Sequence, residues 1–298
     1  MKSGFVSFIG RPNAGKSTLL NRMVGTKIAI VSDKPQTTRT RILGVRHYPE
    51  GQVVFLDTPG IHRPLHRMNV RMVDAAVGTI RDVDVLGLVV DATEPLGNGD
   101  RFVLDLLKDA SAPVFLLLNK IDLMKKSRLL PLIDQCRREE LFAEIIPISA
   151  STGENVDRLE RAVLARLPEG ERLYPDDFLT DQPERFFAAE IVREKLLQFT
   201  HAEIPFSSAV VIDRFEERAG SPPILRLYCT IVVDRESQKP IIIGKGGEMI
   251  KRIGVAAREE LERFFSTRVY LDLHVRVREE WREDERVLDQ IGLGPRDK

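Results

Sequence analysis

Short apolar runs alternate with longer amphipathic stretches along the first part of the chain, up to about residue 167. The runs have the length of buried strands, and the stretches between them place apolar residues at helical spacing. This alternation predicts an α/β fold in which a doubly wound, mostly parallel sheet carries helices on both faces. A further strand at residues 43–48 is expected to pair with residues 53–56 across a turn at residues 49–51. The other expected strands are residues 5–9, 85–90, 114–118 and 145–148, and the expected helices include residues 16–24, 100–109 and 156–167.

The pattern breaks just after residue 167, where prolines, a glycine and aspartates interrupt any helical or strand period. Beyond the break, the pattern predicts a small α+β domain. The expected boundaries are a first domain at residues 1–168, a linker at 169–183 and a second domain at 184–298. Within the second domain we expect a helix at 184–199, strands at 207–215 and 224–233, a long helix at 246–265, a strand at 269–277 and a short charged helix at 281–290.

Charge and composition narrow the classes of function. The chain has 45 acidic and 45 basic residues, so no field of the whole protein attracts nucleic acid, and any such site must be local. Cys136 and Cys229 have neither metal-ligand nor redox-motif spacing, which predicts reduced packing residues and favours the cytosol. The apolar runs are far shorter than the ~18 residues of a membrane-spanning helix, and no signal-peptide layout is seen. We expect a cytoplasmic monomer, with peripheral association at the cytoplasmic face of the inner membrane left open.

A glycine-rich loop follows the first expected strand and enters the first expected helix. Its sequence is Gly10-Arg11-Pro12-Asn13-Ala14-Gly15-Lys16-Ser17, which matches the phosphate-binding P-loop in full. The glycines let backbone N–H groups converge on phosphate oxygens at the positive end of the helix dipole. Lys16 is expected to span the β- and γ-phosphates, and the Ser17 hydroxyl is expected to bind Mg²⁺. Asn13, Ala14, Gly15 and Thr18 complete the expected phosphate contacts.

A second motif, Asp57-Thr58-Pro59-Gly60, stands at the end of the strand at residues 53–56. In a doubly wound sheet, the end of this strand lies beside the phosphate loop. Asp57 is expected to hold Mg²⁺ through a water molecule, and the N–H of Gly60 is expected to meet the γ-phosphate. Loss of that phosphate would release the following segment.

The base is expected to bind at a third motif, Asn119-Lys120-Ile121-Asp122, which follows the strand at residues 114–118. The Asp122 carboxylate can accept hydrogen bonds from the ring N–H and the exocyclic amine of guanine, and adenine has neither donor there. This predicts selection of GTP over ATP. Ser149-Ala150-Ser151, after the last expected strand, is predicted to complete the base pocket.

The four motifs, in this order, resemble the translation-factor-like class of GTPases. In this class a threonine between the first two motifs closes on Mg²⁺, and we favour Thr38 over Thr37 for that role. The resemblance gives Lys16, Thr38, Asp57 and Gly60 as the catalytic set. Many switch GTPases have a glutamine directly after the second motif, whereas this chain has Ile61, so we expect slow intrinsic turnover. Asn13 is associated in similar loops with a K⁺ ion, and an asparagine that bonds its own backbone is an equal alternative.

In the second domain, a Gly-x-x-Gly turn enters the long helix. The stretch Ile243-Gly244-Lys245-Gly246-Gly247, with Lys251 and Arg252 beyond it, resembles the loop with which KH domains bind about four nucleotides of single-stranded RNA. The order of helices and strands is that of the bacterial type of KH domain. Four isoleucines, Ile242, Ile243, Ile250 and Ile253, are predicted to form an apolar groove floor beneath unstacked bases.

From the phosphate loop to the stretch at residues 281–286, the chain resembles the Era family of bacterial ribosome-assembly GTPases. The resemblance implies hydrolysis of GTP to GDP and phosphate with Mg²⁺. It also implies binding near the 3′ end of 16S rRNA and a role in assembly of the 30S subunit. Two alternatives stay open: an RNA-modification partner, which would need a nucleophilic cysteine or a cofactor loop, and a regulator at the membrane or in the cell cycle that contacts protein or lipid.

Overall fold

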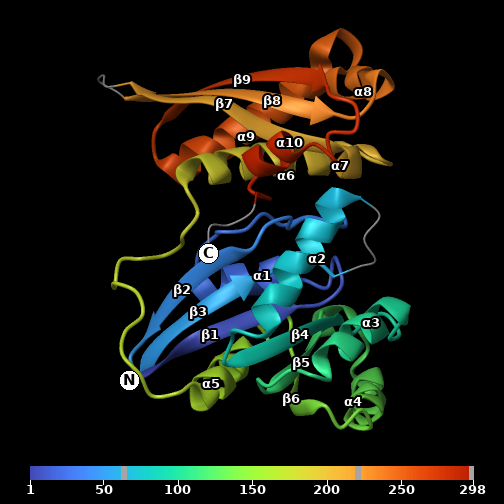
Figure 1. Ribbon diagram of the computed structural model, residues 1–298, viewed down its shortest axis with the longest axis vertical. Coiled ribbons are helices and arrows are strands. Elements are labelled where there is room, and N and C mark those ends of the chain that lie inside the picture. Colours follow the sequence, from blue (N-terminus) through green and yellow to red (C-terminus); the bar gives the residue numbers. More distant parts are fainter. Residues whose placement is uncertain (62–65, 219–222, 295–298) are drawn as a thin grey trace. The chain divides into compact units, whose positions relative to one another are not determined.

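The computed structural model describes residues 1–61, 66–218 and 223–294, and the chain forms two compact units (Figure 1). The first unit comprises Met1–Leu65 and Asn69–Asp181, and the second comprises His66–Met68 and Gln182–Lys298. Residues 62–65, 219–222 and 295–298 of the expected domains lie outside the described residues. The expected domain boundaries at residues 168 and 183 stay a proposal.

Within the described residues, the sheet of the first unit has six strands in the order β2-β3-β1-β4-β5-β6. Strand β2 pairs antiparallel with β3, and the other neighbouring strands are parallel. The doubly wound α/β fold is therefore confirmed, as is the predicted pairing of the second strand with the third. The strands are β1 (Lys2–Ile9), β2 (Ile42–Tyr48), β3 (Gly51–Asp57), β4 (Val85–Asp91), β5 (Val114–Asn119) and β6 (Phe142–Pro147).

Helices cover both faces of this sheet. Helices α2, α3 and α4 share one buried cluster with strands β4 and β5, so they cover the same face, whereas α1 and α5 lie on the other (Figure 1). Helix α1 ends at Gly25, whose φ of 87° makes the left-handed turn that ends many helices. The helices are α1 (Lys16–Val24), α2 (Arg67–Ile80), α3 (Asn98–Leu107), α4 (Leu129–Arg137) and α5 (Val156–Arg166).

Part of the segment expected to be a linker packs on the first unit. Tyr174 and Phe178 stack with ring centroids 4.6 Å apart and lie against the apolar cluster of β2 and β3. The Gln52 side chain accepts hydrogen bonds from the N–H groups of Leu173 and Tyr174, both at 3.0 Å, and donates to the Tyr174 carbonyl at 2.7 Å. Side-chain hydrogen bonds thus fix this connection, which composition alone marks as irregular.

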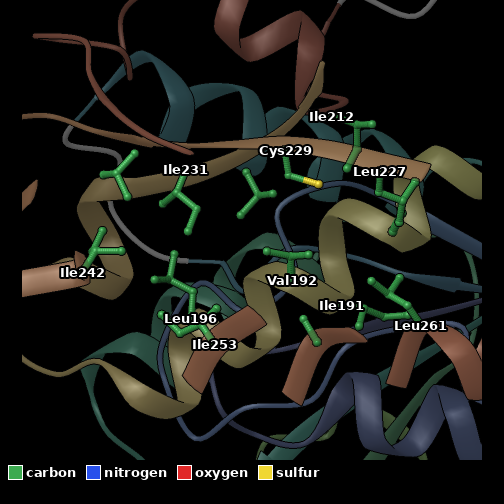
Figure 2. Packing of buried hydrophobic residues seen from close by; sticks show 14 of the residues in the cluster. Ile191, Val192, Leu196, Ile212, Leu227, Cys229, Ile231, Ile242, Ile253 and Leu261 are labelled. Carbon is green, nitrogen blue, oxygen red and sulfur yellow. The ribbon is translucent and has the colours of Figure 1, made fainter. Parts of the chain in front are cut away.

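In the described part of the second unit, strands β7, β8 and β9 form a sheet in that order, with β7 antiparallel and β9 parallel to β8. Helices α6 and α9 supply the apolar side chains opposite this sheet; in Figure 2, Val192 of α6, Cys229 of β8 and Ile253 of α9 belong to one core. The predicted KH-type order is confirmed. The elements are α6 (Glu184–Phe199), α7 (Ile204–Ser207), β7 (Ser208–Arg218), β8 (Ile224–Val233), α8 (Lys239–Ile243), α9 (Glu248–Phe265), β9 (Arg268–Val277) and α10 (Glu285–Gln290).

Two expected helices begin later than predicted. Helix α9 begins at Glu248 because Gly246 and Gly247 have φ angles of 61° and 82°, which an α-helix does not contain. The C-terminal helix begins at Glu285, not near residue 281. Trp281 is fully buried in a turn before it, and its indole N–H donates to the Ser207 carbonyl at 2.9 Å. This segment is therefore anchored in the fold and is more than the solvated charged face that its composition predicts.

Several smaller features complete the comparison with the predicted elements. Helices α2, α4, α7 and α8 were not among the predicted elements, and the strand expected at 145–148 is β6, shifted toward the N-terminus. Both cysteines are free and buried, and burial raises the pKa of Cys136 to about 11 and that of Cys229 to about 12. Neither thiol has the lowered pKa of a nucleophilic cysteine, so neither offers the group that the RNA-modification alternative would need. No helix of the described residues is long and apolar enough to cross a bilayer.

Candidate nucleotide and RNA sites

The phosphate loop joins β1 to α1 and forms one wall of a large cavity of about 1080 Å³. Its shape requires glycine at two points. A Cβ at Gly10 would lie 2.3 Å from the Val89 carbonyl oxygen, and one at Gly15 would lie 2.2 Å from the Asn119 side-chain nitrogen. Gly15 also has a φ of 97° and stands directly before α1, so the first N–H groups of that helix face the cavity. Such a helix N-terminus binds anions well.

Lys16 lies in the first turn of α1 and is buried. Its ammonium group donates to the carbonyl oxygens of Gly10 and Arg11 at 3.2 and 2.9 Å. Burial lowers the pKa of Lys16 to about 8, and the charge of Asp57 opposes this shift. An anion in the cavity would stabilise the protonated ammonium, because the buried charge then has a partner.

Three oxygen-bearing side chains meet behind the phosphate loop. The Ser17 hydroxyl lies 2.6 Å from the Thr38 hydroxyl and donates to Asp57 Oδ2 at 2.7 Å, and Thr38 also donates to Oδ2 at 3.1 Å. The structure thus brings Thr38 to this cluster, whereas the Thr37 hydroxyl donates to the Lys34 carbonyl at 2.6 Å.

Asp57 is the most constrained member of this cluster. Its carboxylate is fully buried, and burial raises its pKa, against the opposing effect of Lys16. Oδ1 has no hydrogen-bond partner among the described residues. A buried, unpaired carboxylate oxygen beside two hydroxyl oxygens matches the all-oxygen ligands that Mg²⁺ takes in proteins.

In the second motif, residues 57–60, only the last residue lines the cavity. The Thr58 hydroxyl donates to the Phe8 carbonyl at 3.0 Å, so it ties β3 to β1, and neither it nor Pro59 lines the cavity. Gly60 does line it, and a Cβ there would lie 2.7 Å from the Pro12 nitrogen. The Ile61 side chain is buried in the core cluster shared with α2 and α3. An apolar, buried residue at this position cannot hydrogen-bond an attacking water.

The two motifs expected to bind the base, residues 119–122 and 149–151, are linked through Asn119. Its amide donates to the Ala14 carbonyl at 2.8 Å and accepts from the Ala150 N–H at 2.9 Å, so it joins the phosphate loop to the segment at residues 149–151. Asp122 is exposed, and the Ser151 hydroxyl lies 3.4 Å from its carboxylate. Ser149 in turn lies 3.1 Å from Ser151. The Asp122 carboxylate therefore stays accessible to a ligand.

The cavity also has walls that motif analysis missed. Lys120 donates to Asp91 at 2.6 Å, and Arg11 donates to Asp100 at 2.9 Å at the start of α3. A signal for Asp91 exists in the sequence, because it directly follows an apolar strand whose carboxyl end faces the ligand side of a parallel sheet. The Asn13 amide donates to the Asp33 carbonyl at 2.6 Å, so it bonds a distant segment and not its own loop.

The Gly-x-x-Gly turn forms the candidate RNA site. Gly244 has a φ of 74°, and a Cβ there would lie 2.7 Å from Met249 Cβ, so only glycine fits. At Gly246 and Gly247 an added Cβ would meet no atom within 4 Å, which leaves their backbone open to approach. Lys245 and Lys251 are exposed beside this open backbone.

The predicted apolar groove floor is partly wrong. Ile242 and Ile253 are fully buried in the core and cannot contact a base, because their side chains fill the space between sheet and helices. Ile243 and Ile250 are partly buried and remain accessible. Arg252 is exposed, and its guanidinium lies 4.2 Å from the centroid of the Phe199 ring on α6, which holds its charge near the helix surface.

Comparison with known proteins agrees with this geometry. A family model described as 50S ribosome-binding GTPase matches residues 5–120, and a KH domain model matches residues 203–282. The fold and the cavity together define the chain as a P-loop GTPase that carries a KH domain, an enzyme that converts GTP to GDP and phosphate.

The full-length relatives give the family. The chain is 51% identical over 291 residues to GTPase Era of Geobacter metallireducens, covering 98% of this chain and 97% of that protein. It is 52% identical to GTPase Era of Syntrophus aciditrophicus, covering 98% and 95%. The chain belongs to the Era family of GTPases.

Two solved structures of Era match almost the whole chain. One is Era in complex with MgGDPNP and nucleotides 1506–1542 of 16S ribosomal RNA, with 43% identity, a TM-score of 0.95 and coverage of 99% of this chain and 100% of that one. The other is a variant of Aquifex aeolicus Era bound to GDP and AlF4⁻, with 43% identity, a TM-score of 0.93 and the same coverage.

Proposed function

We propose that this GTPase is a switch that binds the 3′ end region of 16S rRNA through its KH domain and assists assembly of the 30S subunit. The observation that carries the proposal is the likeness, over 99% of this chain, to Era in complex with MgGDPNP and nucleotides 1506–1542 of that RNA. The open backbone at Gly246 and Gly247 and the exposed Lys245 and Lys251 support it. Because net charge is zero, RNA affinity depends on such local positive groups.

We propose the following roles for the site residues, which the geometry described above supports. Lys16 would neutralise charge on the phosphates, and Thr38 and Asp57 would hold Mg²⁺. The Gly60 N–H would donate to the γ-phosphate. When that phosphate leaves, the contact at Gly60 is lost. The residues proposed to bind the nucleotide are Asn13, Ala14, Gly15, Lys16, Ser17, Thr18, Asp57, Thr58, Pro59, Gly60, Asn119, Lys120, Asp122, Ser149, Ala150 and Ser151. Those proposed to bind the metal are Ser17, Thr38 and Asp57. Those proposed to bind RNA are Ile243, Gly244, Lys245, Gly246, Gly247, Lys251 and Arg252.

Mg²⁺ fits the cluster of Ser17, Thr38 and Asp57. The unpaired Oδ1 of Asp57 is the feature that argues for a cation, because a buried carboxylate oxygen without a partner is costly. When bound, the ion supplies charge neutralisation for the phosphates. The protein's part is to hold the hydroxyl and carboxylate oxygens in place through the contacts among these side chains.

Hydrolysis by the isolated protein should be slow and should depend on K⁺. Ile61 cannot orient water, and we propose that Asn13 helps to place a K⁺ ion that offsets charge in the transition state. We expect single-turnover hydrolysis to be about tenfold faster in KCl than in NaCl at equal ionic strength, because a cation that fits the site stabilises the transition-state charge and a tenfold change in rate needs only about 1.4 kcal/mol. Equal rates in the two salts would remove the K⁺ proposal. A fast rate in NaCl would contradict the slow-turnover prediction.

RNA binding should weaken steeply with salt. We expect the protein to bind a short single-stranded RNA with the sequence of the 16S 3′ end, with log K falling linearly as log salt rises and a slope of about −2 for three phosphate contacts. Fluorescence anisotropy from 50 to 300 mM KCl, in the GTP-analogue and GDP states, measures this. A scrambled RNA and lipid vesicles serve as comparisons. Affinity for vesicles but not for RNA would favour the alternative, a regulator attached peripherally to the cytoplasmic face of the inner membrane, over a cytoplasmic monomer bound to the 30S subunit.

A further inference from the structure

An arginine outside the motifs described above donates hydrogen bonds to the loop at residues 149–153, which is expected to bind the base. Arg22 lies in the last turn of α1 and extends to the segment that follows β6. Its Nε donates to the Ala150 carbonyl at 2.6 Å, and its Nη2 donates to the Ser151 carbonyl. One guanidinium thus binds two successive carbonyl groups that lie 128 and 129 residues further along the chain.

The loop that Arg22 holds carries the other base-side contacts. Within it, the Ala150 N–H donates to Asn119, and the Ser151 hydroxyl lies 3.4 Å from Asp122. At Gly153 the φ is 91° and an added Cβ would lie 2.9 Å from Arg22 Nη1, so the guanidinium packs closely beneath the turn. Arg22 therefore holds the carbonyl groups of the same two residues, Ala150 and Ser151, that contact Asn119 and Asp122.

We propose that Arg22 is a positioning residue for guanine, which holds residues 149–153 in the form that receives the base. The proposal rests on the base pocket assigned above. The planar guanidinium has donors in a fixed fork, so binding two adjacent carbonyls fixes the direction of both peptides. A loop that is already ordered does not lose conformational freedom when the ligand arrives, and this raises affinity without a direct contact. Since α1 begins at Lys16, one rigid helix connects the phosphate end of the site to its base end.

The test is the rate of nucleotide release from full-length protein with Mg²⁺. For Arg22→Met we expect GDP to dissociate about tenfold faster, the loss that one or two charge-assisted hydrogen bonds at a partly exposed site would give. A non-hydrolysable GTP analogue should dissociate faster by the same factor, because both carry the same base. The KM for GTP should rise with kcat unchanged. Arg22→Lys should recover only part of the wild-type affinity, because an ammonium cannot bind both carbonyls in a fork.

The control is Arg158→Met, which removes an exposed arginine on α5 for which the described residues show no hydrogen bond or ion pair. It should leave the release rates unchanged. Nucleotide-free Arg22→Met should still unfold in one cooperative transition, with a melting temperature lower by only a few degrees (~5 °C), since the loop keeps its own turn bonds, such as Gly153 N–H to the Ser149 carbonyl at 2.8 Å.

Three results would overturn the proposal. They are release of GDP that is accelerated less than twofold, faster release of the GTP analogue but not of GDP, and a fall in kcat at unchanged KM. The Asp122→Asn variant distinguishes this failure from failure of the pocket itself. If Asp122→Asn changes base preference and Arg22→Met has no effect, the pocket stands and the role of Arg22 is refuted. If Asp122→Asn leaves preference unaltered, the pocket assignment is wrong.

Discussion

Replacing Asp122 by Asn should lower the affinity for GDP by about a thousandfold and should move preference toward xanthosine diphosphate. The carboxylate can accept from both donors on guanine, whereas an amide offers one acceptor and places a donor against the exocyclic amine. Xanthine has a carbonyl in place of that amine, so the amide of the variant can donate to it. Displacement of a fluorescent GDP analogue by GDP and by xanthosine diphosphate measures both affinities.

This change should leave the fold intact. Asp122 is exposed in the short 3₁₀ helix η1 (Ile121–Leu123), and Asn has nearly the same shape. Asp109→Asn, which removes an exposed carboxylate just after α3, is the matched control and should bind GDP as wild type does. Guanine-over-xanthine preference equal to that of wild type would show that Asp122 does not contact the base.

Substitution of Gly247 by Asp should abolish binding of single-stranded RNA, with a loss of at least about a hundredfold at low salt, while GTP hydrolysis is retained. The reason is electrostatic: a carboxylate would stand where the RNA backbone approaches, and opposing like charges at an interface costs several kcal/mol. The domain should still fold. An added Cβ at Gly247 meets no atom within 4 Å, and Asp tolerates the left-handed φ of 82° better than most residues.

Gly247→Asn is the control for this prediction, because it adds the same bulk and the same backbone strain without the charge. We expect it to retain much more RNA affinity than the aspartate variant in an anisotropy titration, and the circular dichroism spectra of the two variants should coincide. Unchanged RNA affinity in Gly247→Asp would refute the assignment of this turn as the RNA site. Equal losses in both variants would refute the electrostatic reason.

Local patterns predicted most of the first unit because its central strands β1, β3, β4 and β5 are largely buried and read as short apolar runs. Helix α2 was not among the predicted helices, although its buried residues Met72, Ala76 and Ile80 stand at the four-residue spacing of a helical face; Gly78 and the β-branched residues around it lower its helix propensity. Helix α4 contains Pro131, which local rules treat as a break, although a proline in the first helical turn costs little. Burial of Trp281 could not be foreseen either, because its neighbours in sequence are charged.

The sequence alone determined the kinds of site in this protein, because a phosphate loop, a guanine motif and a Gly-x-x-Gly turn are each formed by a few consecutive residues with special backbone needs. Only the tertiary structure decided which residues complete them. It places the Thr38 hydroxyl, already favoured over Thr37 from the sequence, beside Ser17 and Asp57, and it places Ile242 and Ile253 in the core and not in the groove. These contacts join residues from different elements, 19 and 21 residues apart for Thr38 and 128 for Arg22 and Ala150, and a local pattern along the chain does not show which of them meet.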